Sequence, residues 1–108
     1  MELTLSYEDE DESGTETISD ANRYDSPDFD PTTVELSNAR YIEYETAVLV
    51  NATGSDLTMV VQHHKGDATR YEHVTEVNRT PESLCIKQSD ETNPDYLPPH
   101  DSIKWITE

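Results

Sequence analysis

The sequence predicts an all-β domain, either an antiparallel β-sandwich or a small, jelly-roll-like barrel. Short segments with alternating apolar residues are separated by clusters of turn-forming residues. Their spacing of roughly 8–12 residues is typical of sandwiches and small barrels. Because no segment of ten or more residues carries an apolar stripe with the helical period, we expect no helix.

The first expected strand covers residues 3–7, where Leu3, Leu5 and Tyr7 alternate on one face. Five consecutive acidic residues follow, and the chain then stays rich in Ser, Thr, Asp and Pro up to Pro31. This composition predicts an irregular conformation. We therefore divide the chain into an acidic N-terminal arm with a short first strand, 1–33, and an antiparallel β-sandwich domain, 34–108, which should fold without the arm.

The strongest strand signals lie between residues 41 and 62. A strand over 41–50 places Ile42, Tyr44, Val48 and Val50 on one face, and a second strand is expected at 57–62. Residues 51–56, with the sequence NATGSD, are turn formers. The two strands should therefore pair with each other as an antiparallel hairpin.

The later strands are shorter and are expected at residues 69–77, 84–87 and 101–107. Turns should lie at 65–67 and 78–81, and a long polar loop at 89–99. In the last strand, simple alternation places Ile103 and Trp105 on the same face.

The charge restricts the partners that this chain can bind. It has 24 acidic and 7 basic residues, a formal net charge of -17, and only three lysines, and both 1–33 and 34–108 are acidic. Such an even spread is typical of adaptation to molar salt, where the Debye length is about 3 Å. Direct contact with nucleic acid or with an anionic membrane needs clustered Lys and Arg, so we expect neither partner.

Other sequence features argue against a membrane span, secretion and catalysis. No apolar run could cross a bilayer, and the N-terminus lacks the features of a signal peptide. Cys85, the only cysteine, lies in an apolar run and is expected in the core. His63 and His64 should point to opposite faces of a strand and so cannot easily share one ion. We expect no catalytic residue, no metal site and no cofactor, and hence no enzyme.

Protein contact is the remaining class of function, and aromatic side chains are its best candidates because they are enriched at interfaces. Two of them could anchor the arm on a partner, three could form exposed contacts or cross-strand ladders, and a tryptophan could serve as core anchor or interface residue. In that order the candidates are Tyr24, Phe29, Tyr41, Tyr44, Tyr71 and Trp105.

Two segments resemble small β-sandwich decoration and minor capsid proteins of tailed viruses. Residues 47–61, AVLVNATGSDLTMVV, are similar to their pattern of strand, Asn-rich turn and strand, and residues 97–106, LPPHDSIKWI, to their closing strand. The resemblance and the halophile-like composition imply a structural protein in the virion of a haloarchaeal tailed virus. Such a protein would stabilise the particle in high salt.

The partners implied by this resemblance are other virion proteins, either the major capsid protein or neighbouring copies of the chain in a homo-oligomer. Two alternatives stay open. One is a head-tail joining or tail ring subunit. The other is an acidic DNA mimic that inhibits a host nucleic-acid-binding protein, which would need its acids on a rigid face at phosphate-like spacing.

Overall fold

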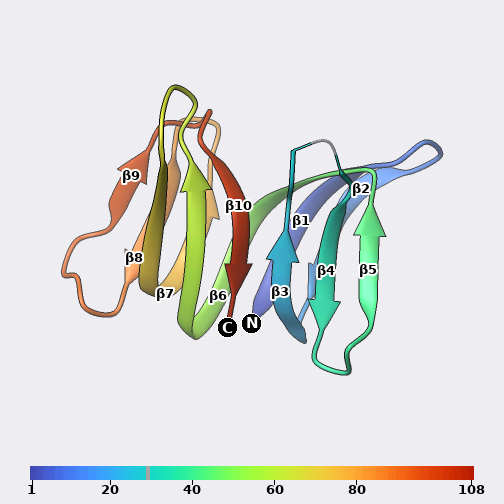
Figure 1. Ribbon diagram of the computed structural model, residues 1–108, viewed down its shortest axis with the longest axis horizontal. Helices are drawn as coiled ribbons and strands as arrows, with labels where there is room; N and C mark the ends of the chain where they lie inside the picture. The colour runs from blue at the N-terminus through green and yellow to red at the C-terminus, as the bar shows by residue number, and fades with distance from the viewer. Residues whose placement is uncertain (29) are drawn as a thin grey trace.

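The computed structural model describes residues 1–28 and 30–108, which contain ten strands and no helix (Figure 1). The prediction of an all-β antiparallel fold is confirmed. No helix in these residues has the length and hydropathy needed to cross a membrane. The strands are β1 (Glu2–Glu8), β2 (Ser13–Ile18), β3 (Ala21–Asp25), β4 (Thr32–Leu36), β5 (Tyr41–Tyr44), β6 (Thr46–Gln62), β7 (Ala68–Arg79), β8 (Leu84–Gln88), β9 (Asp95–Leu97) and β10 (Ser102–Thr107).

All ten strands belong to one antiparallel sheet, which does not close into a barrel. Its main path runs β5-β4-β3-β10-β6-β7-β8-β9, and β1 joins β2 to β6 beside this path. The long strand β6 organises the sheet. One of its edges pairs with β1 over residues 46–53 and then with β10 over residues 58–62, while β7 pairs along the opposite edge.

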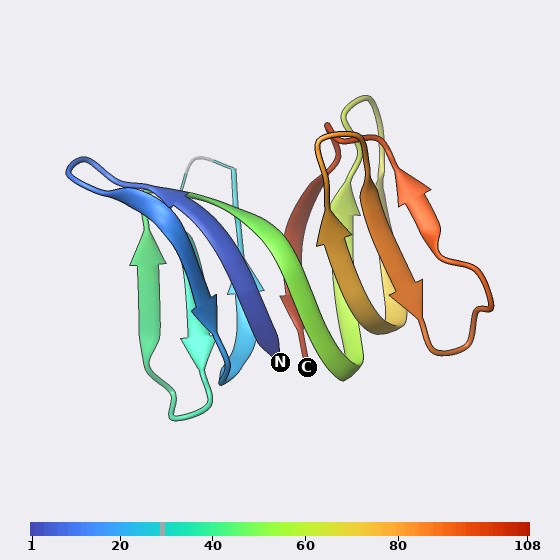
Figure 2. The same ribbon diagram turned by 180° about the vertical axis from the view of Figure 1, so that it is seen from behind.

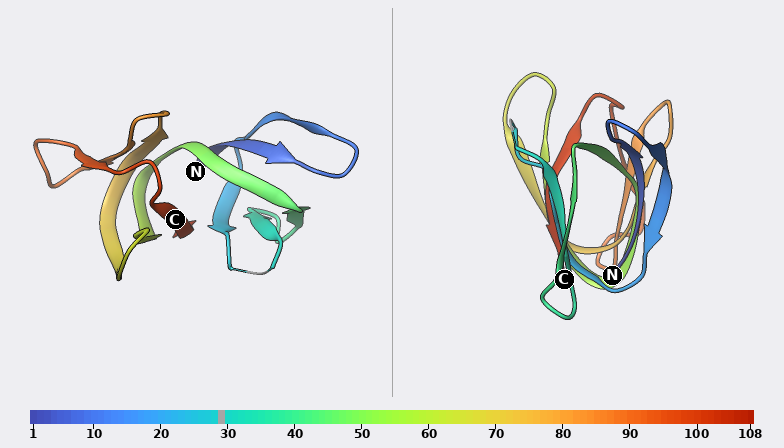
Figure 3. Two further views of the ribbon diagram at one scale, coloured as in Figure 1. Left: turned by 90° about the horizontal axis from the view of Figure 1, so that it is seen from above. Right: turned by 90° about the vertical axis from the view of Figure 1, so that its right-hand side faces the viewer.

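These pairings fold the sheet into two facing layers, seen end-on in the right panel of Figure 3. Layer A, in front in Figure 2, contains β2, β1, residues 46–53 of β6, residues 74–79 of β7, β8 and β9. Layer B, in front in Figure 1, contains β5, β4, β3, β10, residues 57–62 of β6 and residues 68–71 of β7. Strands β6 and β7 therefore belong to both layers.

Strand β6 passes from layer A to layer B at Gly54. The register with β7 shifts between Thr53 and Leu57, so residues 54–56 leave the ladder. A Cβ atom on Gly54 would lie 2.6 Å from Cδ2 of Leu57, a core side chain that is 1% exposed. Glycine therefore lets the backbone of the bend approach the core. Strand β7 bends at the matching point, where His73 adopts a left-handed φ of 57°.

One apolar core fills the space between the layers. It is continuous from the β1–β5 end of the molecule to the β7–β9 end, because side chains of β6 contribute along its whole length. Its fully buried members include Leu3, Leu5, Tyr24, Val34, Leu49, Leu57, Met59, Val61, Val74, Leu84, Ile86 and Ile106.

The expected irregular conformation of residues 8–33 is wrong. They contain β2, β3 and the start of β4, and the acids at 8–12 form the β1–β2 turn, where the Asp9 N–H donates to the Glu12 carbonyl at 2.7 Å. The sequence does not reveal β2 because Ile18 is its only buried residue, so the strand shows no alternation of apolar residues. The boundary expected between 33 and 34 falls inside β4.

The expected hairpin between 41–50 and 57–62 is also wrong. Residues 41–44 form β5, and β6 continues through the expected turn at 51–56, so its two halves do not pair with each other. Gly54 bends the chain between layers instead of reversing it. The other expected strands are confirmed within two residues at each end, and β9 adds a short strand inside the expected loop at 89–99.

Deleting residues 1–33 should unfold the chain, contrary to the sequence-based expectation that 34–108 folds alone. The deletion removes the buried side chains of Leu3, Leu5, Ile18 and Tyr24. At about 1.5–3 kcal/mol each, their burial matches the whole stability of a typical domain. Circular dichroism in about 3 M salt should show no cooperative thermal unfolding.

A matched control changes the exposed β1–β2 turn alone. Glu10→Asn with Asp11→Gly introduces the preferred residues of a two-residue hairpin turn and should leave cooperative unfolding intact. A cooperative transition in the 34–108 fragment would show that the N-terminal strands are dispensable.

Candidate interaction surface

Trp105 lies on the outer face of layer B, and a β-bulge places it there. The register of β10 against β6 shifts between Ile103, which pairs with Val61, and Trp105, which pairs with Val60. The extra residue, Lys104, reverses the alternation, so Ile103 and Ile106 point into the core while Trp105 points outward. The prediction that Ile103 and Trp105 share a face is therefore wrong.

Two arginines flank the half-buried indole. The guanidinium carbon of Arg23, from β3, lies 4.9 Å from the ring centroid, and that of Arg70, from β7, lies 5.8 Å away. Both distances permit cation–π attraction. Arg23 also makes two hydrogen bonds to the Asp25 carboxylate, at 2.8 and 3.0 Å, which raise the pKa of the guanidinium above its ordinary value.

The surface around Trp105 is charge-balanced at its centre. Three of the seven basic residues lie here, and each pairs with an acid: Arg23 with Asp25 at 2.8 Å, Lys104 with Asp28 at 2.6 Å, and Arg70 with Glu72 at 3.4 Å. Beside the indole is a shallow depression of about 560 Å³, lined by Asp25, Pro27, Asp28, Thr33, Val60, Gln62, Ala68, Lys104 and Trp105. We call this area the Trp105 surface.

One row of directly paired residues crosses all six strands of layer B on its outer face. Successive cross-strand partners on β7, β6, β10, β3, β4 and β5 are Arg70, Val60, Trp105, Asp25, Thr33 and Glu43. Side chains of direct partners point to the same side of a sheet. The face is therefore continuous from one edge of the layer to the other.

The six aromatic candidates lie in different places. Tyr41, 67% exposed, shares the outer face of layer B with Trp105 through its pairing with Glu35. Tyr71 is half-buried and faces the interior opposite Met59, where burial raises the pKa of its hydroxyl.

The other two tyrosine candidates, Tyr24 and Tyr44, are core residues. Tyr24 is 2% and Tyr44 4% exposed, so neither offers a surface to a partner. The Tyr44 hydroxyl donates to the Glu16 carboxylate of the facing layer at 2.7 Å. Burial and, as the second-largest cause, this carboxylate raise the pKa of the Tyr44 hydroxyl. Phe29 lies outside the described residues.

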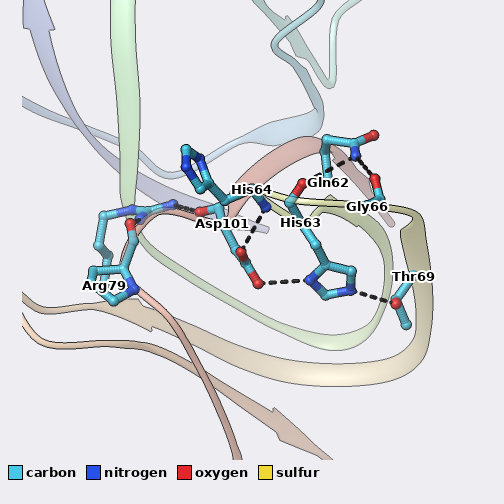
Figure 4. A network of polar contacts seen from close by, with 8 residues as sticks. Gln62, His63, His64, Gly66, Thr69, Arg79 and Asp101 are labelled. Atoms are coloured by element: carbon cyan, nitrogen blue, oxygen red, sulfur yellow. Dashed lines mark hydrogen bonds and ion pairs between the residues drawn. The ribbon is translucent and has the colours of Figure 1, made fainter.

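A polar network joins the β6–β7 turn to the start of β10 (Figure 4). The carboxylate of Asp101, 3% exposed, contacts Nδ1 of His63 at 2.7 Å and accepts the backbone N–H of His64 at 3.0 Å. A carboxylate can only accept, so Nδ1 carries the proton. The other ring nitrogen of His63 lies 2.6 Å from the Thr69 hydroxyl.

Arg79 extends the network into the molecule. Its guanidinium donates to the carbonyl oxygens of Leu49, Pro99 and Asp101 at 3.3, 2.9 and 3.1 Å, which ties layer A to the loop before β10. Burial lowers the pKa of this guanidinium. Burial by itself would raise the pKa of Asp101, but the hydrogen bonds from His63 and His64 outweigh it, so the pKa lies below its ordinary value.

The order Thr69, His63, Asp101 reproduces the hydrogen bonds of a nucleophile, base and carboxylate triad. Its placement favours a structural role. His63 and Asp101 line a shallow depression together with His64, Lys65, Leu97, Pro98 and His100, but Thr69 is not part of this lining and pairs with the buried Val61 on the inner face of the sheet. A nucleophile must be accessible to its substrate, so we interpret the network as a clamp between the turn and the loop.

The expected placement of His63 and His64 on opposite faces of a strand is wrong, because both lie in the β6–β7 turn and line the same shallow depression. His63 contacts Asp101, and the ring of His64 lies 5.4 Å from that of His100. Within the described residues, no group of three or more His, Cys, Asp or Glu side chains is arranged to hold a metal ion.

Sequence reasoning identified Trp105 but missed the basic residues around it. Arg23 and Arg70 are distant from the tryptophan along the chain, and only the strand order brings them to it. Lys104 is its neighbour in sequence, but no motif marks the lysine as part of a site. No known protein family matches the chain, and comparison with curated proteins and with solved structures gives no match either.

Replacing Asp101 with Asn should destabilise the fold by about 2–3 kcal/mol, because one buried donor, from His63 or His64, then faces an amide NH₂. The matched control is Asp56→Asn, which changes the exposed His73–Asp56 pair, 3.0 Å apart, and should leave stability unchanged. Chemical denaturation at pH 7 measures both. Equal stability of the two variants would contradict the clamp.

The same pair of variants tests the pH dependence. Because the pKa of Asp101 is depressed in the fold, its contribution is present above its ordinary pKa and is lost as pH falls through the folded value. From about pH 5 to pH 2, wild type should therefore lose more stability than Asp101→Asn does. Parallel losses would mean that the carboxylate is not specifically stabilised.

Proposed function

We propose that this chain is a non-catalytic structural subunit, a capsid decoration or minor capsid protein of a haloarchaeal tailed virus. It binds neighbouring virion proteins and stabilises the particle in high salt. The observation that carries this proposal is the Trp105 surface, an aromatic and arginine-rich face that is charge-balanced on a chain of formal net charge -17.

Trp and Arg are the residue types most often found at energetically dominant positions of protein interfaces. Proteins from a high-salt environment carry acidic surfaces, so a partner would be repelled by most of this molecule at low salt. The Trp105 surface lets a partner approach closely without an unbalanced charge. At molar salt, where screening acts within about 3 Å, burial of the indole and short-range polar contacts would provide the binding energy.

A subunit of a shell also needs a rigid shape. The Asp101 clamp and the Arg79 contacts hold together the loop before β10 and the bent strands that support Trp105. Rigid elements lose little conformational entropy on binding, which favours tight association through a modest area.

A specific observation keeps the DNA mimic as a second candidate. Next to the β1–β2 turn is an acidic depression of about 400 Å³, lined by Asp9, Glu10, Asp11, Glu12, Pro31, Glu43 and Glu45. A mimic would present such carboxylates to a basic protein in place of phosphates. The two functions use different residues, so variants can separate them.

Trp105→Ala should weaken attachment to virions at least about tenfold, because truncation of a dominant interface residue costs about 2 kcal/mol or more. The measurement is cosedimentation of labelled chain with virions purified from the source culture in about 3 M salt. The control is Tyr96→Ala, which removes an aromatic side chain that is 69% exposed on layer A and should leave attachment unchanged.

Failure of the wild-type chain to sediment with virions, or equal attachment of Trp105→Ala, would contradict the proposal. Displacement of duplex DNA from a basic host protein by the wild-type chain, lost on replacing Glu10 and Asp11, would support the mimic instead.

A further inference from the structure

Open edges of a sheet are templates for strand addition, and proteins protect them with prolines, charges, short strands or covering segments. Each layer of this molecule ends in two edge strands. In layer A the β9 edge is protected: the strand has three residues and lies between Pro94 and Pro98. The opposite edge of layer A is β2.

Both edges of layer B are also protected. The β7 edge spans only residues 68–71 and carries the charged Arg70. Just beyond it, the Gln88 side chain donates to the Glu72 carbonyl at 2.9 Å and the Ser89 N–H to the His73 carbonyl at 2.8 Å. The β5 edge has four residues and carries Glu43, which lines the acidic depression.

Strand β2 carries fewer of these devices, and its one protective feature is the inward-facing charge of Glu16. It has six residues, SGTETI, without Pro, Lys or Arg, and its register with β1 is regular throughout. Its one charged residue, Glu16, points inward and accepts the Tyr44 hydroxyl. Within the described residues, β1 is its only strand partner.

The turn shows which backbone groups of β2 face outward. The bond from the Asp9 N–H to the Glu12 carbonyl makes residues 9 and 12 a hydrogen-bonded pair. Along an antiparallel ladder, hydrogen-bonded pairs alternate with pairs that exchange no hydrogen bonds. Ser13, Thr15 and Thr17 belong to the second kind of pair, so their N–H and C=O groups point away from β1. These three residues offer a regular ladder to another extended strand.

We propose that the β2 edge pairs antiparallel with β2 of a second copy, so that layer A continues across a two-fold axis as one sheet. Such an isologous contact is the commonest kind in homodimers. Antiparallel pairing places the two acidic turns, 9–12, at opposite ends of a seam about 20 Å long, beyond the Debye length of about 10 Å at 0.1 M salt. Parallel pairing would place them side by side.

The outer face of layer A suits the same partner. Its central row of cross-strand partners, from β2 to β9, contains no charged residue: Thr17, Thr4, Asn51, Asn78, Cys85 and Tyr96. The expected core position of Cys85 is therefore wrong, because its neighbours Leu84 and Ile86 are the residues of β8 that point inward. On a chain with so many acids, a second copy can approach this end of layer A without meeting carboxylates on its outer face, because Glu16 of β2 faces the interior and accepts the Tyr44 hydroxyl. Hydroxyl groups at Ser13, Thr15 and Thr17 can add cross-strand hydrogen bonds.

Light scattering in about 3 M salt should give twice the 12.3 kDa mass of one chain, with dissociation on dilution. Thr15→Pro should shift the dimer dissociation constant at least about tenfold, because it removes an outward N–H while leaving the β1 ladder intact. The control, Thr15→Val, keeps this N–H and should dimerise normally. A monomer at every concentration, or an unchanged Thr15→Pro dimer, would overturn the proposal.

Amide hydrogen exchange provides a readout that needs no variant. Raising the concentration of wild-type chain should increase protection of the Ser13, Thr15 and Thr17 amides, and protection should stay constant at Gly14 and Glu16, whose N–H groups already face β1. Uniform or absent changes would contradict edge pairing. Trp105→Ala should still dimerise, so failure of this inference is distinguishable from failure of the proposed virion attachment.

Discussion

The bend of β6 and β7 is the constraint on which the rest of the structure depends. Seventeen residues of β6 serve both layers, and β1 and β10 share one of its edges only because the strand changes direction between them. Gly54 makes this possible, since any side chain there would meet Leu57 in the core. The core is therefore one continuous body although its strands belong to two layers.

A bent sheet that does not close leaves its layers free to separate at the ends, and polar contacts limit this. At the β7–β9 end, Asp101 and Arg79 fix the loop before β10 to the β6–β7 turn and to β6. At the β1–β5 end, Tyr44 contacts Glu16 of the facing layer, and its ring lies 5.6 Å from that of Tyr7. The buried polar groups thus define the spacing that the apolar core alone would leave adjustable.

Local pattern predicted the fold class and most strands because alternation reports burial directly, as at Leu3, Leu5 and Tyr7. Prediction from local pattern failed where the alternation of apolar residues is interrupted and where nearly all residues of a strand are exposed. Gly54 in a run of turn formers looked like a reversal, and β2 looked irregular because almost all of it is exposed. The bulge at Lys104 inverted the expected face of Trp105. Strand order, which brings Arg23 and Arg70 to the indole, depends on long-range pairing that periodicity does not encode.

The Trp105 surface and the central row of layer A differ from the remainder of the molecule in the same way. With 24 acidic residues on the chain, an area whose charges are paired or missing is the exception, and both are such areas. In molar salt, long-range repulsion cannot orient partners because it is screened within about 3 Å. Selection of a binding face must then come from contacts at van der Waals and hydrogen-bond distance. In the assembly that we propose, an indole between two guanidinium groups and the outward ladder of backbone groups on β2 would supply such contacts, and they lie on different layers, so one copy could use both at once.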